Sequence, residues 1–108
     1  MSKHHLGEFE EIVLLTVAIL FEEAYGVSIL EEMEKRLDRK VSIGSLQTVL
    51  RRLEKKGYLA SEFGEATQVR GGKRKRFFQV TNYGKKVLQE TKNQRQRLWN
   101  AIPKIVFE

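Results

Sequence analysis

The sequence predicts a mainly helical fold that carries one small β-hairpin. Three segments before Gly57 have a helical pattern, and two short segments after it are rich in aromatic and β-branched residues. A long helical segment follows from residue 82. With 108 residues, of which 41% are hydrophobic, the chain has the size of one compact unit rather than two.

The composition excludes several kinds of site and favours an anionic partner. The chain has no cysteine, so disulfides, thiolate metal sites and thiol nucleophiles are excluded. Residues 1–38 contain three basic and nine acidic residues, whereas residues 39–108 contain seventeen basic and five acidic ones. This asymmetry favours a polyanionic partner, with nucleic acid ahead of a membrane surface. The alternative is a basic face that is only solvated.

The first predicted helix spans about Glu8–Glu23 and contains the apolar run Ile12–Phe21. The length of the segment and its lack of turn residues favour a helix over a buried strand. The run is about half as long as a bilayer span, and its acidic flanks differ from the basic start of a signal peptide. We therefore expect a cytoplasmic protein without a membrane partner. A helix that is apolar on nearly all sides needs cover on all sides, and a second copy of the chain is the simplest cover.

The second and third helices are predicted over Val27–Leu37 and Ile43–Lys56. Ser42 is a suitable N-cap for the third helix, and Gly57 is a suitable residue just beyond its C-terminus. One face of this helix is an apolar stripe of Leu46, Val49, Leu50 and Leu53. The opposite face is polar and basic, and consists of Ser45, Gln47, Thr48, Arg51, Arg52 and Lys55.

Two strands and a last helix complete the pattern. Tyr58–Phe63 and Arg76–Val80 are predicted to pair around the loop 64–75, which is rich in glycine, lysine and arginine. Thr81 caps a helix predicted over Asn82–Ala101, and Pro103 ends or kinks that helix.

Three helices followed by a hairpin form a winged helix-turn-helix, an arrangement suited to DNA. A helix of about three turns fits the major groove, where its outward side chains reach base edges. Its N-terminal N–H groups and its basic side chains reach phosphates. We therefore predict DNA contacts from Ser42, Gly44, Ser45, Gln47, Thr48, Arg51, Arg52 and Lys55.

The loop between the strands is predicted to be a second DNA anchor, on phosphates or in the minor groove. The predicted contacts are Arg70, Gly72, Lys73, Arg74 and Lys75. An ordinary turn whose basic residues keep an edge soluble is the alternative, and the nearby basic helix face favours the DNA anchor. Residues 1–81 are then the DNA-binding part, and residues 82–108 are a dimerisation helix and tail in the same compact unit.

Five segments resemble the PadR family of bacterial transcriptional regulators: Gly7-Glu8-Phe9, Ala24-Tyr25-Gly26-Val27, Ser42-Ile43-Gly44-Ser45-Leu46, the stretch 52–57 and the stretch 71–84. The resemblance runs from about Leu6 to Leu88. It implies a dimeric repressor that dimerises through its last helix with help from the first, in the smaller subfamily whose C-terminal part is one helix. Members usually carry a tyrosine that contacts a DNA phosphate where this chain has Gln47. Glutamine can donate to phosphate or pair with adenine, so this departure bears on operator preference more than on DNA binding itself.

Trp99 is a candidate for either of two roles, together with Leu98, Ile102 and Val87. A large aromatic side chain contributes much buried area, which favours a dimer interface. The resemblance implies the other role, because some PadR-like regulators bind flat aromatic drugs between tryptophans of the last helix. In that case Trp99 would form the wall of a pocket for a small aromatic effector.

No cofactor, metal site or catalytic set is expected. His4 and His5 are adjacent but lack supporting ligands, and they are the only histidines available to a serine nucleophile. Glu54 is expected to pair locally rather than to read bases. The acidic residues of Glu8–Asp38 are expected on outer helix faces, where they contribute to solubility.

The sequence thus predicts a sequence-specific regulator, a homodimeric repressor of double-stranded DNA with an inverted-repeat operator, and not an enzyme. A winged-helix module that binds only proteins is the alternative, although such a module does not need the basic loop. An RNA-binding winged helix would show exposed stacking aromatics, whereas Phe77 and Phe78 are predicted to be buried.

Overall fold

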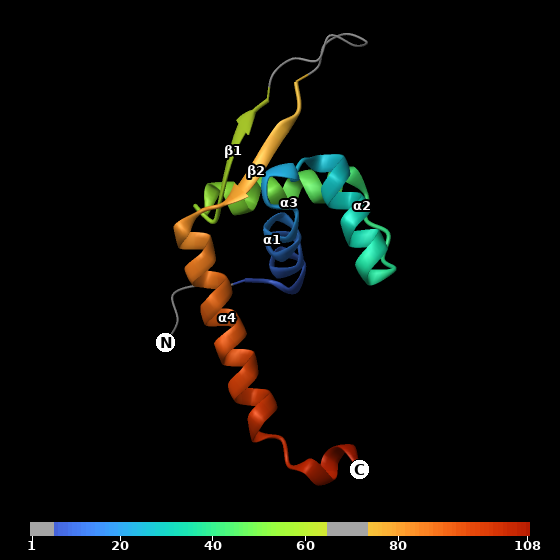
Figure 1. Ribbon diagram of the computed structural model, residues 1–108, viewed down its shortest axis with the longest axis vertical. Helices are drawn as coiled ribbons and strands as arrows, with labels where there is room; N and C mark the ends of the chain where they lie inside the picture. Colours follow the sequence, from blue (N-terminus) through green and yellow to red (C-terminus); the bar gives the residue numbers. More distant parts are fainter. Residues whose placement is uncertain (1–5, 65–73) are drawn as a thin grey trace.

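The computed structural model describes residues 6–64 and 74–108 (Figure 1). Three helices come first, a two-stranded hairpin follows, and a long helix ends the chain. Their bounds are α1 Glu8–Leu20, α2 Gly26–Leu37, α3 Ile43–Lys55, β1 Leu59–Phe63, β2 Arg76–Val80 and α4 Asn82–Ala101, with 3-10 turns η1 Phe21–Glu23 and η3 Lys104–Phe107. This mostly helical architecture with an antiparallel hairpin confirms the predicted winged helix-turn-helix class.

Helix α1 is shorter than predicted. The sequence favoured a helix to Glu23, but α1 ends at Leu20 and a 3-10 turn follows. Phe21 has a positive φ of 55°, which a bulky side chain rarely adopts and which stops the helix. Val13, Leu14 and Val17 face the core, whereas Leu15 and Ile19 on the other side are 44% and 50% exposed. The single chain therefore leaves one apolar side of α1 uncovered.

Local capping chemistry sets both ends of α3. The Ser42 Oγ accepts the N–H of Ser45 at 3.1 Å, as a capping residue does. Gly57 follows the helix with a φ of +84°, a backbone conformation that glycine adopts without strain. The predicted cap and the predicted terminating glycine are both confirmed.

The core lies between the three helices and the base of the hairpin. Buried side chains of α1, α2 and α3 meet Leu59 and Phe78 of the strands and Val87 of α4. The strands pair with Leu59 opposite Val80 and Phe63 opposite Arg76. In addition, the N–H of Phe78 donates to the carbonyl of Ala24 at 2.8 Å, which fixes β2 to the segment after α1.

The end of α3 and the start of α4 meet at one joint. Thr81 caps α4 by accepting the N–H of Gly84 at 2.9 Å, and its hydroxyl donates to the carbonyl of Gly57 at 2.6 Å. A Cβ on Gly84 would lie 2.2 Å from the carbonyl oxygen of Tyr58. The first turn of α4 therefore lies directly against the backbone that follows α3.

Helix α4 then leaves the body of the molecule. Figure 1 shows it running away from the hairpin, so that the hairpin strands and the C-terminus lie at opposite ends of a molecule 59 Å long. The helix ends at Ala101, before Pro103, as predicted, and the η3 turn follows. Its outer part buries little, because Leu98 is 72% exposed and Trp99 is 62% exposed.

Candidate nucleic-acid interface

The outer face of α3 consists of polar and basic side chains. The predicted apolar stripe of this helix is buried and fixes the helix to the core. All eight predicted contact residues of the segment are exposed: Ser42, Gly44, Ser45, Gln47, Thr48, Arg51, Arg52 and Lys55. The helix therefore presents one continuous hydrophilic face of about three turns to solvent.

The first turn of α3 leaves room for close approach by a ligand. A Cβ built on Gly44 would meet no atom within 4 Å. The hydroxyls of Ser42 and Ser45 lie 2.9 Å apart, and Thr48 donates to the carbonyl of Gly44 at 3.0 Å. Each hydroxyl oxygen still has lone pairs available for a base or water donor. This end of the helix also carries backbone N–H groups without intrahelical partners, which favour an anion.

The later turns of α3 carry positive charge. Within residues 6–64 and 74–108, no carboxylate forms an ion pair with Arg51 or Lys55. Their charges are therefore available to phosphates. Lys56, just after the helix, is engaged instead with Glu10.

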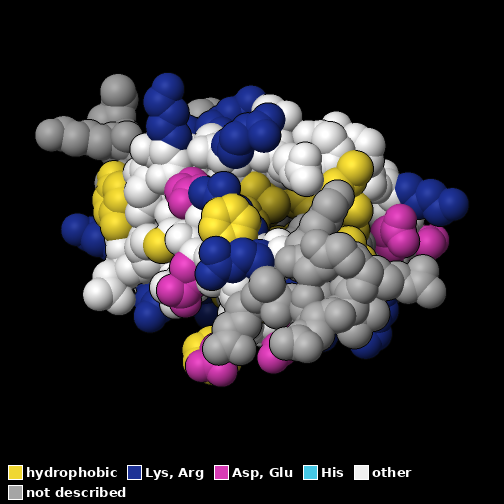
Figure 2. All heavy atoms as spheres, turned by 90° about the horizontal axis from the view of Figure 1, so that it is seen from above, with side chains coloured by type: hydrophobic (Ala, Val, Ile, Leu, Met, Phe, Trp, Pro, Cys, Tyr) yellow, Lys and Arg dark blue, Asp and Glu magenta, His cyan; other side chains and the backbone are white. Residues whose placement is uncertain are grey.

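Two basic residues just before β2 lie close to aromatic rings. The guanidinium of Arg74 lies 5.9 Å from the centre of the Phe63 ring, and its Nε donates to the carbonyl of Gly64 at 3.0 Å. The ammonium of Lys75 lies 4.3 Å from the Tyr25 ring. Figure 2, seen from the hairpin end, shows basic side chains on either side of an exposed ring. The predicted contacts Arg70, Gly72 and Lys73 lie outside the described residues.

Arg76 is held by the protein itself. Its guanidinium donates to Glu54 at 3.1 Å and to the Ser61 hydroxyl at 2.8 Å, and Ser61 also donates to Glu54. This cluster joins the last turn of α3 to both strands. The expectation that Glu54 pairs locally is confirmed, and the charge of Arg76 is partly neutralised by this pair.

Glu10 is a structural residue that the sequence did not single out. The acidic residues of this region were expected on outer faces, but Glu10 is only 6% exposed. Its carboxylate accepts the Gly7 N–H at 2.9 Å and the Lys56 ammonium at 2.8 Å, so it joins the start of α1 to the end of α3. Burial alone would raise its pKa, but the bonds from Lys56 and Gly7 and the charge of Arg52 lower the pKa below the ordinary 4.5. Its position three residues into the helix was the only signal in the sequence.

Comparison with known proteins identifies the family to which this chain belongs. Residues 14–90 match the PadR-like family of transcriptional regulators. The chain belongs to this family. A PadR-like protein is a DNA-binding transcriptional regulator and not an enzyme. No curated protein sequence matches the chain significantly.

Solved PadR-like structures share the fold. A PadR-like transcription factor from Bacteroides fragilis is 27% identical, with a TM-score of 0.72 over 85% of this chain and 84% of that one. A PadR family regulator from Eggerthella lenta is 28% identical, with a TM-score of 0.70 over 92% of this chain and 86% of that one. A PadR-like regulator from Bacillus cereus, at 20% identity and a TM-score of 0.71, shares the fold.

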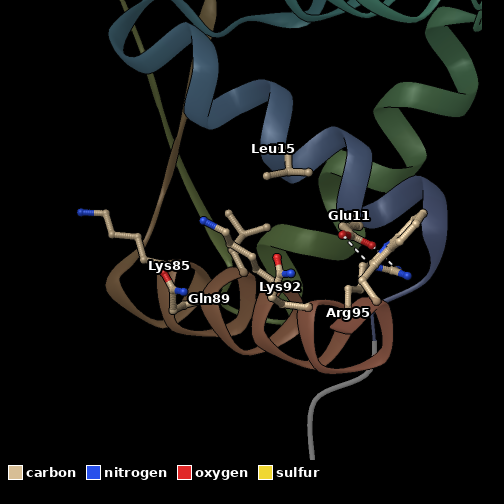
Figure 3. A pocket seen from close by; sticks show the side chains of 9 residues that line it. Glu11, Leu15, Lys85, Gln89, Lys92 and Arg95 are labelled. Carbon is tan, nitrogen blue, oxygen red and sulfur yellow. Dashed lines mark hydrogen bonds and ion pairs between the residues drawn. The ribbon is translucent and has the colours of Figure 1, made fainter. Parts of the chain in front are cut away.

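This PadR-like chain has a second surface feature, a pocket of about 520 Å³ between α1 and α4. Figure 3 shows Glu11 and Leu15 of α1 facing Lys85, Gln89, Lys92 and Arg95 of α4. Arg95 donates to Glu11 through Nε at 3.1 Å and Nη2 at 2.5 Å, and these bonds raise the pKa of Arg95. Leu88 and Trp99 complete the apolar part of the wall.

The four residues predicted for an interface or effector pocket have different positions. Trp99 and Leu98 are exposed, Ile102 is half-buried, and Val87 is 1% exposed. Val87 thus belongs to the core of its own chain rather than to a free surface. The Trp99 ring stacks on Phe107, with centroids 6.1 Å apart.

Residues 6–64 and 74–108 include no helix with the length and hydropathy needed to cross a membrane. Over the same ranges, no three His, Asp or Glu side chains gather where a metal ion could bind. His4 and His5 lie outside the part of the chain that the structure describes.

Proposed function

We propose that this PadR-like regulator is a homodimeric repressor that binds an inverted-repeat operator through two copies of α3. The observation that carries the proposal is the outer face of α3, which is fully exposed, polar at its start and cationic further along. Each α3 would enter a major groove, with the two grooves about 34 Å apart on one side of the duplex. Ser45, Gln47 and Thr48 would read base edges, and Arg51, Arg52 and Lys55 would bind phosphates.

The hairpin supports the same orientation of the chain on DNA, with α3 in the major groove. Arg74 and Lys75 lie just before β2, and with Arg70, Gly72 and Lys73 they form the proposed wing contact on phosphates or in the minor groove. Phosphate contacts release counterions, so binding is expected to weaken steeply as salt increases.

The uncovered apolar side chains support a homodimer. Leu15 and Ile19 of α1 and Leu98 and Trp99 of α4 are exposed in the single chain. A second copy that covers them would bury apolar surface and add stability to a small domain. Residues 1–81 are the proposed DNA-binding part, and residues 82–108 are the proposed dimerisation helix and tail.

A small aromatic effector is the proposed signal that relieves repression. The α1–α4 pocket offers Leu15, Leu88 and Trp99 as apolar walls and charged groups at its rim, a combination that suits a flat ligand. Trp99 is the only tryptophan, so its fluorescence reports on this pocket alone. Titration with naphthoate and with ethidium in the absence of DNA tests the site, and an unchanged emission with both would argue against it.

Selection of bound duplexes from a random pool, followed by gel-shift titration at several salt concentrations, tests the main proposal. For the parent protein we expect the selected duplex to be palindromic. Arg51→Ala should bind more weakly and with a smaller salt dependence, and Gln47→Ala should show an altered sequence preference. Lys35→Ala at an exposed position of α2 is the matched control and should bind normally. Unchanged affinity of Arg51→Ala, or no selected duplex, would favour a protein-interaction module instead.

A further inference from the structure

A second hollow of about 570 Å³ lies at the base of the hairpin. It is bounded by the end of α1, both strands and the start of α4. We name it the wing groove and define it by Ala18, Phe21, Phe63, Phe77, Val80 and Leu88. Glu22, Glu23 and Glu62 also line it, so the groove is apolar with an acidic rim.

The wing groove displays aromatic surface that the single chain does not cover. Phe21 is 72% exposed and Phe63 is 56% exposed. Phe21 also has the positive φ of 55°, a strained conformation for a bulky residue. Strain and exposure at the same side chain both disfavour this arrangement in an isolated chain, and cover by an apolar segment would offset the exposure.

The tail of the chain is apolar and carries a lysine, so it complements a groove that is apolar with an acidic rim. Ile105, Val106 and Phe107 are 73%, 60% and 69% exposed in the η3 turn, and Lys104 precedes them. The tail does not reach the groove of its own chain, because about 20 Å of α4, from Leu88 to Ala101, separates the two (Figure 1). An occupant with this sequence must therefore come from another copy.

We propose that the tail Ile102–Phe107 of one copy occupies the wing groove of a second copy, an inference that rests on the proposed homodimer. Lys85 and Leu88 at the start of α4 line the groove, and the same helix ends in the tail. In the proposed arrangement the two α4 helices would run antiparallel about a twofold axis, so that each tail would lie beside the other copy's groove. Lys104 then meets the acidic rim of Glu22 and Glu62.

This contact would connect the dimer to the wing. The walls of the groove include Phe63 and Gly64 at the end of β1 and Phe77 to Val80 of β2. A tail held between α1 and these strands would fix the angle at which the hairpin leaves the body. Each copy would thus help to orient the DNA-binding wing of its partner.

The absence of native cysteine allows a direct test by disulfide cross-linking of the full chain. A disulfide forms only where two Cα atoms come within about 7 Å. We expect the double variant Glu22→Cys with Val106→Cys to give a covalent dimer on a non-reducing gel after mild oxidation. The matched control, Glu34→Cys on the exposed side of α2 with Val106→Cys, should give several-fold less, as should each single variant.

The outcomes separate this contact from the homodimer itself. A protein that is dimeric by light scattering but cross-links no better in the Glu22 pair than in the Glu34 pair overturns the tail contact and leaves the dimer intact. Cross-linking of Val106→Cys alone would place the two tails together, which also overturns it. A monomer at the cross-linking concentration defeats both proposals. In the native chain, which has no cysteine, Val106→Asp should keep the helical content but weaken duplex binding.

Discussion

The buried carboxylate of Glu10 joins two helices through an ion pair with the partly exposed Lys56. Because its pKa is lowered in the folded chain, the unfolded chain binds more protons at acidic pH. Stability from this group is therefore complete above the ordinary value of 4.5 and is lost as pH falls through the folded pKa.

Glu10→Gln should lower the free energy of unfolding at pH 7 by about 1–3 kcal/mol, since it removes a charged partner from Lys56. The difference from the parent should shrink as the pH falls below 4.5 and through the folded pKa of Glu10, because the parent then also loses this charge. Urea unfolding at a series of pH values from 7 downward measures this. Glu31→Gln on the exposed face of α2 serves as the control, and a Glu10→Gln effect that is the same at every pH would contradict the assignment.

Two glycines should respond in opposite ways to alanine. In Gly84→Ala the new Cβ would lie 2.2 Å from the Tyr58 carbonyl oxygen, and we expect a loss of about 1–3 kcal/mol or more. In Gly44→Ala the Cβ meets nothing, so stability should rise by up to about 1 kcal/mol. If α3 approaches DNA as proposed, Gly44→Ala should nevertheless weaken duplex binding. Thermal unfolding and gel shifts of both variants provide the comparison.

The contacts of a single residue could be predicted from the sequence where its partner is close in the chain. Glu54 was expected to pair locally, and Ser61, seven residues later, is one of its partners. Arg76 and Glu54 are 22 residues apart, and no periodicity reveals that contact. Glu10 was missed because Glu8, Glu10 and Glu11 are all favourable at a helix N-terminus, and only tertiary packing selects the one that is buried.

At the scale of elements, boundaries set by capping chemistry were predictable. Ser42, Gly57 and Thr81 fix the ends of α3 and the start of α4 through bonds within a few residues. The end of α1 was not predictable, because no turn residue marks it. Phe21 stops that helix with a conformation that its residue type disfavours.

The two capped helices should differ in sensitivity to loss of the cap. Thr81→Ala should destabilise more than Ser42→Ala, for which about 1 kcal/mol is expected. Thr81 makes a second hydrogen bond, to the carbonyl of Gly57, whereas the Ser42 cap is exposed. Chemical denaturation compares the variants, and Thr81→Ser should restore most of the loss. Equal losses at the two sites would mean that the bond to Gly57 contributes little.

At the scale of the whole molecule, the sequence predicted that α1 needs more cover than one small domain supplies. Leu15 and Ile19 are indeed exposed in the single chain. The sequence did not indicate the wing groove, because its walls come from α1, the hairpin and α4, and only the fold brings these together.

Leu15→Asp should disrupt the proposed dimer without unfolding the chain. The side chain is 44% exposed, so a carboxylate there stays hydrated in the monomer but would be buried in a dimer. Light scattering should show a shift to monomer, and circular dichroism should be unchanged. The control is Glu31→Asp on the exposed face of α2. Ser28→Asp is unsuitable as a control because the Ser28 hydroxyl forms hydrogen bonds at the start of that helix. A Leu15→Asp protein that remains dimeric would exclude this side of α1 from the interface.

The joint between Tyr58, Thr81 and Gly84 makes α4 a lever arm for α3. With the first turn of α4 in direct contact with the backbone after α3, the two helices must rotate together. For an arm of about 30 Å, a change of about 5° in its tilt moves the far end by roughly 3 Å, close to the rise of one base pair. A ligand that moves the two α4 helices of a dimer slightly apart would therefore change the distance between its two α3 helices by about one base-pair step along the duplex.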